Sequence, residues 1–150
     1  MTTRRHCLIQ LSSLGASALL VPAVAAMAEV DPLVKRSRAY ADGGQIREGK
    51  VALEIAPLVD NGNSVPITVS VQSPMTATDR VVGIAVFNEK NPQPEVAEFT
   101  LGPRAGHAKI ATRIRLATSQ RLVAVAKMAD GSCWTHTVEV VVTLAACLED

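Results

Sequence analysis

One of the three cysteines, Cys147, follows a run rich in β-branched residues, Val140 to Thr143, near the end of the sequence. Such runs favour a strand, and chain ends beyond a last strand are among the most accessible parts of a domain. A thiol placed there can be reached by other proteins, whereas a catalytic thiol needs an electropositive environment built around it. This position suits a carrier better than an enzyme pocket, and the sequence indicates no catalytic residue.

A second group of residues has the types expected of a metal site. The spacing Cys133-x-x-His136 is familiar for metal ligands, and Met75, His107 and Met128 could add ligands of the kind copper accepts. Residues three apart on a strand point to opposite faces, so Cys133 and His136 would not close on one ion. We therefore expect no metal or cofactor, and a copper-binding module ranks third among the interpretations. No convincing catalytic triad and no phosphate-binding loop can be assembled from the sequence.

A disulfide between Cys133 and Cys147 is the simplest alternative use of the two thiols. If residues 134–144 form one strand, the two sulfurs lie roughly 45 Å apart at about 3.3 Å per residue, far beyond disulfide geometry. We expect Cys133 to pack or pair near the turn that precedes the strand. An intermolecular disulfide through Cys147 stays open.

Residues 1–28 resemble an export signal of the twin-arginine (Tat) type. Arg4 and Arg5 precede an apolar stretch from Leu11 that closes on Ala26-Met27-Ala28, a small-residue cleavage site. We expect the mature chain to begin at Glu29 and to be periplasmic, with no membrane attachment after cleavage. A retained N-terminal anchor is the alternative.

Without the expected signal, 122 of the 150 residues remain, a length typical of one domain. Without Arg4 and Arg5, 13 basic residues face 14 acidic ones, and only 3% of the chain is aromatic. Nucleic-acid binding relies on basic patches and stacking aromatics. We therefore expect no nucleic-acid partner.

The elements that must position Cys147 are mostly strands. Asp31 and Pro32 predict a helix start and Gly43-Gly44 its end, so residues 29–46 form a short helix and linker. Residues 47–144 form an all-β domain, and residues 145–150 form a tail with the cysteine. Asp130-Gly131 predicts a hairpin. Period-two alternation predicts seven strands, at residues 51–55, 67–71, 81–87, 96–101, 110–116, 122–128 and 134–144.

Seven short strands with turn signals between them favour an immunoglobulin-like antiparallel β-sandwich; a small closed barrel is the alternative. Trp134 is expected in the core or at an interface. The residues from Val81 to Val86 are apolar on both faces, so they fit either a core or an interface. Arg113 and Arg115 are expected on a solvated face.

Several ordered motifs resemble those of the SoxY sulfur-carrier proteins over residues 47–147. The segments that carry the resemblance are Asn61-Gly62-Asn63-Ser64-Val65-Pro66, Val71-Gln72-Ser73-Pro74-Met75, Phe87-Asn88 with Asn91-Pro92, Phe99 to Gly106, Thr112-Arg113-Ile114-Arg115-Leu116, and Met128 to Trp134. The resemblance implies an immunoglobulin-like sandwich paired with a SoxZ subunit. It also implies that sulfur intermediates travel on the terminal cysteine between periplasmic enzymes, which contact the tail transiently.

The tail departs from the family pattern Gly-Gly-Cys-Gly-Gly, because Ala145 and Ala146 precede Cys147. Alanine restricts the backbone more than glycine, so we expect an arm that moves less and that reaches about 10 Å beyond Leu144 if extended. Glu149, Asp150 and the terminal carboxylate oppose formation of the thiolate, and a partner enzyme with basic groups would have to compensate. The leading hypothesis is a sulfur carrier; the runner-up is a structural or recruiting subunit.

Overall fold

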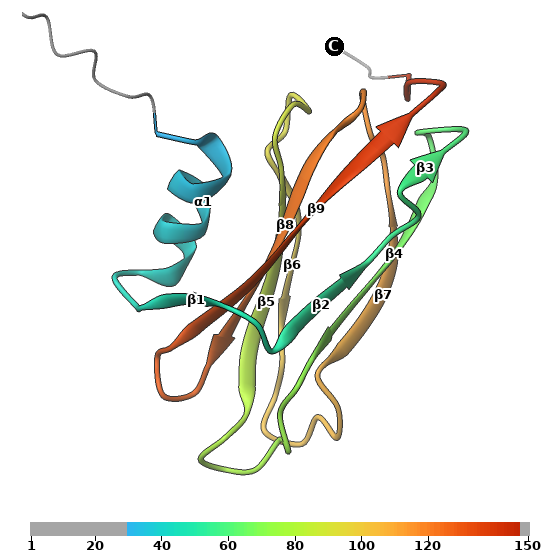
Figure 1. The fold of residues 1–150 in the computed structure, drawn as a ribbon. Coiled ribbons are helices and arrows are strands. Elements are labelled where there is room, and N and C mark those ends of the chain that lie inside the picture. Colours follow the sequence, from blue (N-terminus) through green and yellow to red (C-terminus); the bar gives the residue numbers. More distant parts are fainter. Residues whose placement is uncertain (1–29, 148–150) are drawn as a thin grey trace, which may run out of the picture.

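The computed structural model describes residues 30–147 as a helix and two packed sheets, in three layers (Figure 1). The expected signal peptide, and residues 148–150 of the tail, lie outside the described residues. No helix among the described residues is long and apolar enough to cross a membrane. The elements are α1 (Pro32–Ala41), β1 (Ile46–Glu48), β2 (Val51–Glu54), β3 (Leu58–Val59), β4 (Val65–Val71), β5 (Val81–Asn88), β6 (Glu95–Thr100), β7 (Lys109–Ile114), β8 (Gln120–Met128) and β9 (Cys133–Val142).

The larger sheet has the order β1-β9-β8-β5-β6, with β3 also on β9, and the smaller sheet has the order β2-β4-β7. Alternate residues of both sheets meet in the space between them, including Val65, Ile67 and Val69 of β4 and Leu122 and Ala124 of β8. The predicted sandwich is confirmed, and the closed barrel is wrong because the strands form two separate sheets.

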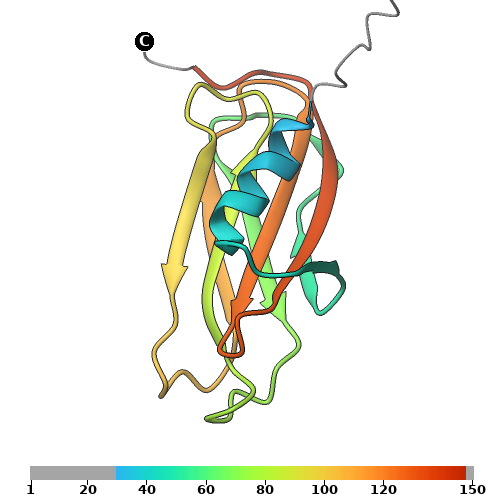
Figure 2. The same cartoon turned by 90° about the vertical axis from the view of Figure 1, so that its left-hand side faces the viewer.

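Helix α1 covers the outer face of the larger sheet (Figure 2). The Asp31 side chain accepts a hydrogen bond from Leu33 N at 2.9 Å, and Pro32 occupies the first turn, as the sequence predicted. Leu33 packs with Ala85 and Phe87 of β5, whose other face lies in the sandwich core. The two-sided apolar character of β5 is therefore explained by core packing on both faces.

Two short strands depart from the antiparallel expectation, since β1 and β3 both pair with β9 in parallel. Ile46 is the Cα partner of Cys133, and Leu58 is the partner of Val141. Strands of three and two residues are too short for alternation to reveal them. The predicted hairpin at Asp130-Gly131 is confirmed between β8 and β9, with Gly131 at φ 84°.

Candidate functional site

The last strand delivers the chain to one end of the sandwich, where three loops meet it (Figure 1). We call this region the tail end: the loops at 60–64, 88–94 and 115–119, together with residues 143–147. Gly62 N donates to Leu144 O at 2.8 Å, and Leu116 N donates to Gly62 O at 2.9 Å. The loops and the tail thus form one hydrogen-bonded unit.

The tail lies across this end of the sandwich and does not extend away from it. Ala146 N donates to Leu116 O and Cys147 N donates to Asn63 Oδ1, each at 3.0 Å. Ala146 is only 8% exposed, whereas Cys147 is an exposed, free thiol. The extended arm considered from the sequence is therefore not the conformation of this chain, because the alanine methyl is buried against the sandwich.

Gly62 makes this docking possible because no side chain fits at its position. A Cβ there would lie 2.3 Å from Leu116 O, 3.0 Å from Ala146 N and 3.2 Å from Val142 Cγ1. Contacts of 2.3 Å are not sterically allowed, so the tail and the Leu116 carbonyl can approach only a glycine. The sequence showed Gly62 as part of a motif but gave no sign of what it touches.

Two asparagines hold the loops that receive the tail. Asn91 Oδ1 accepts from Ala117 N at 3.0 Å and from Gln120 Nε2 at 2.7 Å, while Asn91 Nδ2 donates to Arg115 O at 2.8 Å. The Asn88 side chain is buried and accepts from Asn91 N. Backbone groups on both sides of Leu116 are therefore fixed by side chains of the neighbouring loop.

Cys133 is separated from the tail end and from His136. Its thiol is fully buried beneath α1 and is not bonded to Cys147, in agreement with the geometric prediction. Burial raises the pKa of the Cys133 thiol. His136 lies on the opposite face of β9, where its Nδ1 accepts from Leu53 N at 3.0 Å. Within residues 30–147 no three His, Cys, Asp or Glu side chains are grouped as a metal site.

Trp134 lies at the rim of the sandwich core and is only partly buried. The Lys50 ammonium lies 5.0 Å and the Arg47 guanidinium carbon 5.8 Å from the ring centroid. These distances are typical of cation–π contacts. Trp134 therefore packs against the edge of the core and is not fully buried in it.

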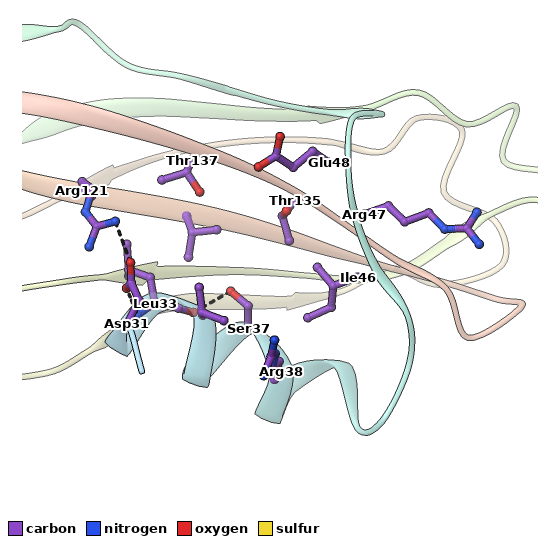
Figure 3. A pocket seen from close by; sticks show the side chains of 12 residues that line it. Asp31, Leu33, Ser37, Arg38, Ile46, Arg47, Glu48, Arg121, Thr135 and Thr137 are labelled. Atoms are coloured by element: carbon purple, nitrogen blue, oxygen red, sulfur yellow. Dashed lines mark hydrogen bonds and ion pairs between the residues drawn. The ribbon is translucent and has the colours of Figure 1, made fainter. Parts of the chain in front are cut away.

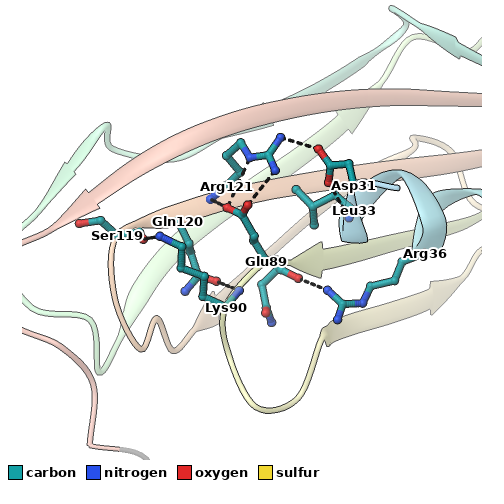
Figure 4. A network of polar contacts seen from close by, with 9 residues as sticks. Asp31, Leu33, Arg36, Glu89, Lys90, Ser119, Gln120 and Arg121 are labelled. Atoms are coloured by element: carbon teal, nitrogen blue, oxygen red, sulfur yellow. Dashed lines mark hydrogen bonds and ion pairs between the residues drawn. The ribbon is translucent and has the colours of Figure 1, made fainter. Parts of the chain in front are cut away.

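An ion-pair network fixes α1 to the sheet (Figure 4). Arg121 Nη1 lies 2.8 Å from Asp31 Oδ2, and Arg121 Nη2 lies 2.7 Å from Glu89 Oε1. Hydrogen bonds from this guanidinium lower the pKa of both carboxyl groups. A groove of about 320 Å³ runs beside the network between α1 and strands β1, β8 and β9 (Figure 3). It contains no thiol.

Comparison with known proteins places the chain in a family. Residues 36–147 match the family model described as sulfur oxidation protein SoxY. The chain belongs to the SoxY family. The structure is similar to that of the sulfur carrier protein SoxY from Chlorobium limicola f thiosulfatophilum, with a TM-score of 0.63, 27% sequence identity and coverage of 75% of this chain and 96% of the other.

Other solved structures share the fold alone. A superoxide reductase (neelaredoxin) from Ignicoccus hospitalis has a TM-score of 0.56 at 18% identity, over 63% of this chain and 80% of the other. A superoxide reductase from Nanoarchaeum equitans has a TM-score of 0.54 at 15% identity, over 64% and 100%. No match was found among curated proteins. SoxY membership therefore rests on the family model and on the Chlorobium structure.

Proposed function

We propose that the chain is a non-catalytic sulfur carrier that binds thiosulfate-derived sulfur covalently at Cys147 and presents it to enzymes of sulfur oxidation. Membership of the SoxY family and the likeness to a sulfur carrier protein support this proposal. The observation that carries it is the contrast between the two thiols of the described chain. Cys147 is exposed at the tail end, and Cys133 is sealed beneath α1.

The chemistry required of Cys147 is simple. Its thiolate sulfur forms a bond to the outer sulfur of thiosulfate, giving Cys–S–S–SO₃⁻ and releasing two electrons, which a partner enzyme accepts. Thiolate, not thiol, is the reacting form. An exposed cysteine outside the last strand can be reached by such an enzyme, while the sandwich supplies a rigid body for the enzyme to bind.

The remaining parts of the proposal concern location and partners. Residues 1–28 have the pattern of a Tat export signal, so the proposed carrier works in the periplasm. It is proposed to form a heterodimer with a SoxZ-like subunit and to contact other Sox-type enzymes transiently through its tail. The proposal includes no cofactor, no metal and no nucleic acid.

Replacement of each thiol tests the proposal. Cys147→Ser should abolish thiosulfate-dependent electron flow and leave co-purification with the partner subunit unchanged. Cys133→Ala is the matched control and should retain the flow. Intact mass and peptide mapping of protein purified after growth on thiosulfate should find a labile adduct on Cys147. Unchanged flow in Cys147→Ser would reject the carrier role and favour the recruiting subunit.

A further inference from the structure

Two exposed arginines lie next to the residues that hold the tail. Arg113 Nη1 donates to Ser64 Oγ at 3.4 Å. Ser64 follows Asn63 in the chain, and the Asn63 side chain accepts from Cys147 N at 3.0 Å. One residue step therefore separates the Arg113 contact from the contact that fixes the cysteine.

Arg115 is connected to the tail by a second route. It precedes Leu116, whose carbonyl accepts from Ala146 N at 3.0 Å, and its own carbonyl accepts from Asn91 Nδ2 at 2.8 Å. The Asn91 side chain of the loop at 88–94 thus holds the Arg115 carbonyl in place. The Arg113 side chain and the Arg115 backbone carbonyl are thus each hydrogen-bonded to a loop of the tail end that is far away in sequence.

The charges of these arginines are not used within the described part of the chain. Between residues 30 and 147 the ion pairs are those of Arg121 with Asp31 and Glu89. Arg113 and Arg115 line a shared groove of about 390 Å³ with one acidic side chain, Glu95. The groove therefore carries a net positive charge beside the tail end.

We propose that Arg113 and Arg115 bind the anionic end of the sulfur group carried on Cys147. This inference deepens the proposed function and rests on it for its biological meaning. The oxidised cargo ends in a sulfonate, and the planar guanidinium fork binds such oxyanions through paired, charge-assisted hydrogen bonds. Arg113 and Arg115 are thus specificity-determining residues for the carried group.

The same two charges answer a difficulty raised by the sequence. Glu149 and Asp150 follow Cys147 closely and repel both a thiolate and an anionic reagent. Basic groups of a partner enzyme were expected to compensate, but Arg113 and Arg115 supply positive charge from the chain itself. The Arg113 guanidinium contacts Ser64, and the neighbouring Asn63 contacts Cys147 N, so only two side chains and one residue step separate the guanidinium from the Cys147 backbone. A cargo of two further sulfur atoms shortens the gap.

Reaction of the full chain with tetrathionate tests the inference without any partner enzyme. The Cys147 thiolate attacks an inner sulfur of tetrathionate, forms Cys–S–S–SO₃⁻ and releases thiosulfate as the leaving group. The measured quantity is the rate of this reaction divided by the rate with neutral iodoacetamide, with the site identified by peptide mapping. The ratio isolates the attraction of an anion from the exposure of the thiol.

The variants are a charge-removing pair and a matched pair. Arg113→Gln with Arg115→Gln should lower the ratio about five- to tenfold at 0.01 M ionic strength, and the difference should disappear in 1 M salt. Arg104→Gln with Lys109→Gln removes the same charge. Lys109 begins β7, about 13 Å from Arg113 along the strand, and Arg104 lies in the loop before it, so this pair should leave the ratio within twofold of the unmodified chain.

Two results would overturn the inference: no fall in the ratio for the Arg113 and Arg115 pair, or an equal fall for the matched pair. Both outcomes are independent of the carrier role, which is tested by electron flow in Cys147→Ser. The arginine inference can therefore fail while the carrier role holds, and the carrier role can fail while the arginine inference holds.

Discussion

Replacement of Gly62 by alanine should detach the tail from the sandwich. The new Cβ would lie 2.3 Å from Leu116 O, and real Cβ contacts stay above 3.0 Å, so one of the two groups must move by at least the difference of 0.7 Å. The movement strains two hydrogen bonds through Gly62, to Leu144 O at 2.8 Å and from Leu116 N at 2.9 Å. It also pushes against Ala146, whose amide binds the same carbonyl.

The magnitude follows from these contacts. Each hydrogen bond contributes about 1 kcal/mol, and lost packing of the Ala146 methyl adds about 0.8 kcal/mol. Gly62→Ala should therefore lower the free energy of unfolding by about 2–3 kcal/mol, as measured by urea denaturation. Hydrogen exchange of a peptide covering residues 140–147 should show that the amides of Ala146 and Cys147 lose protection.

Gly102→Ala is the matched control, because nothing lies within 4 Å of a Cβ there and its φ is not positive. This variant should change the free energy of unfolding by less than about 0.5 kcal/mol and leave exchange at the tail unchanged. The reasoning is refuted if both glycine variants lose the same stability, or if the tail amides of Gly62→Ala stay protected.

Two further predictions concern α1 and the buried thiol. Folding lowers the pKa values of Asp31 and Glu89 from 3.8 and 4.5. Their contribution to stability is therefore present above pH 4.5 and is lost as the pH falls through the lowered pKa values. Arg121→Met should make stability depend less on pH below 4.5, as measured by acid titration followed by circular dichroism. Cys133→Ser should lower the free energy of unfolding by about 1–3 kcal/mol, measured by urea denaturation, because its buried hydroxyl would lack a hydrogen-bond partner. Cys133→Ala should lower the free energy of unfolding less. Equal losses in the two variants would contradict this explanation.

Most of the sandwich could be predicted from local pattern. Alternation placed each of the seven longer strands within two residues of its observed bounds, since one face of each strand is buried. Asp31-Pro32 and Asp130-Gly131 marked a helix start and a hairpin because their chemistry acts over one turn. The position of Cys147 beyond the last strand was enough to predict its exposure.

Docking of the tail could not be predicted, because its partners are distant in sequence. Cys147 and Asn63 are separated by 84 residues, and Asn91 and Ala117 by 26. No periodicity or turn signal encodes such contacts. The two parallel strands were missed for a related reason, since β3 is defined by its pairing with β9 and not by its two residues.

The parallel strands at the two ends of β9 also limit self-association. An uncovered strand edge can recruit an identical chain and start aggregation, but β1 and β3 cover residues 133–135 and 141–142 on that side of β9. β6 is the other outer strand of the larger sheet, and β2 and β7 are the outer strands of the smaller one; β6 carries Glu95 and Glu98, and β7 carries Lys109 and Arg113. Pairing of β6 or β7 with its own copy would bring like charges together, which disfavours growth of the sheets at these two edges while the Cys147 thiol remains exposed.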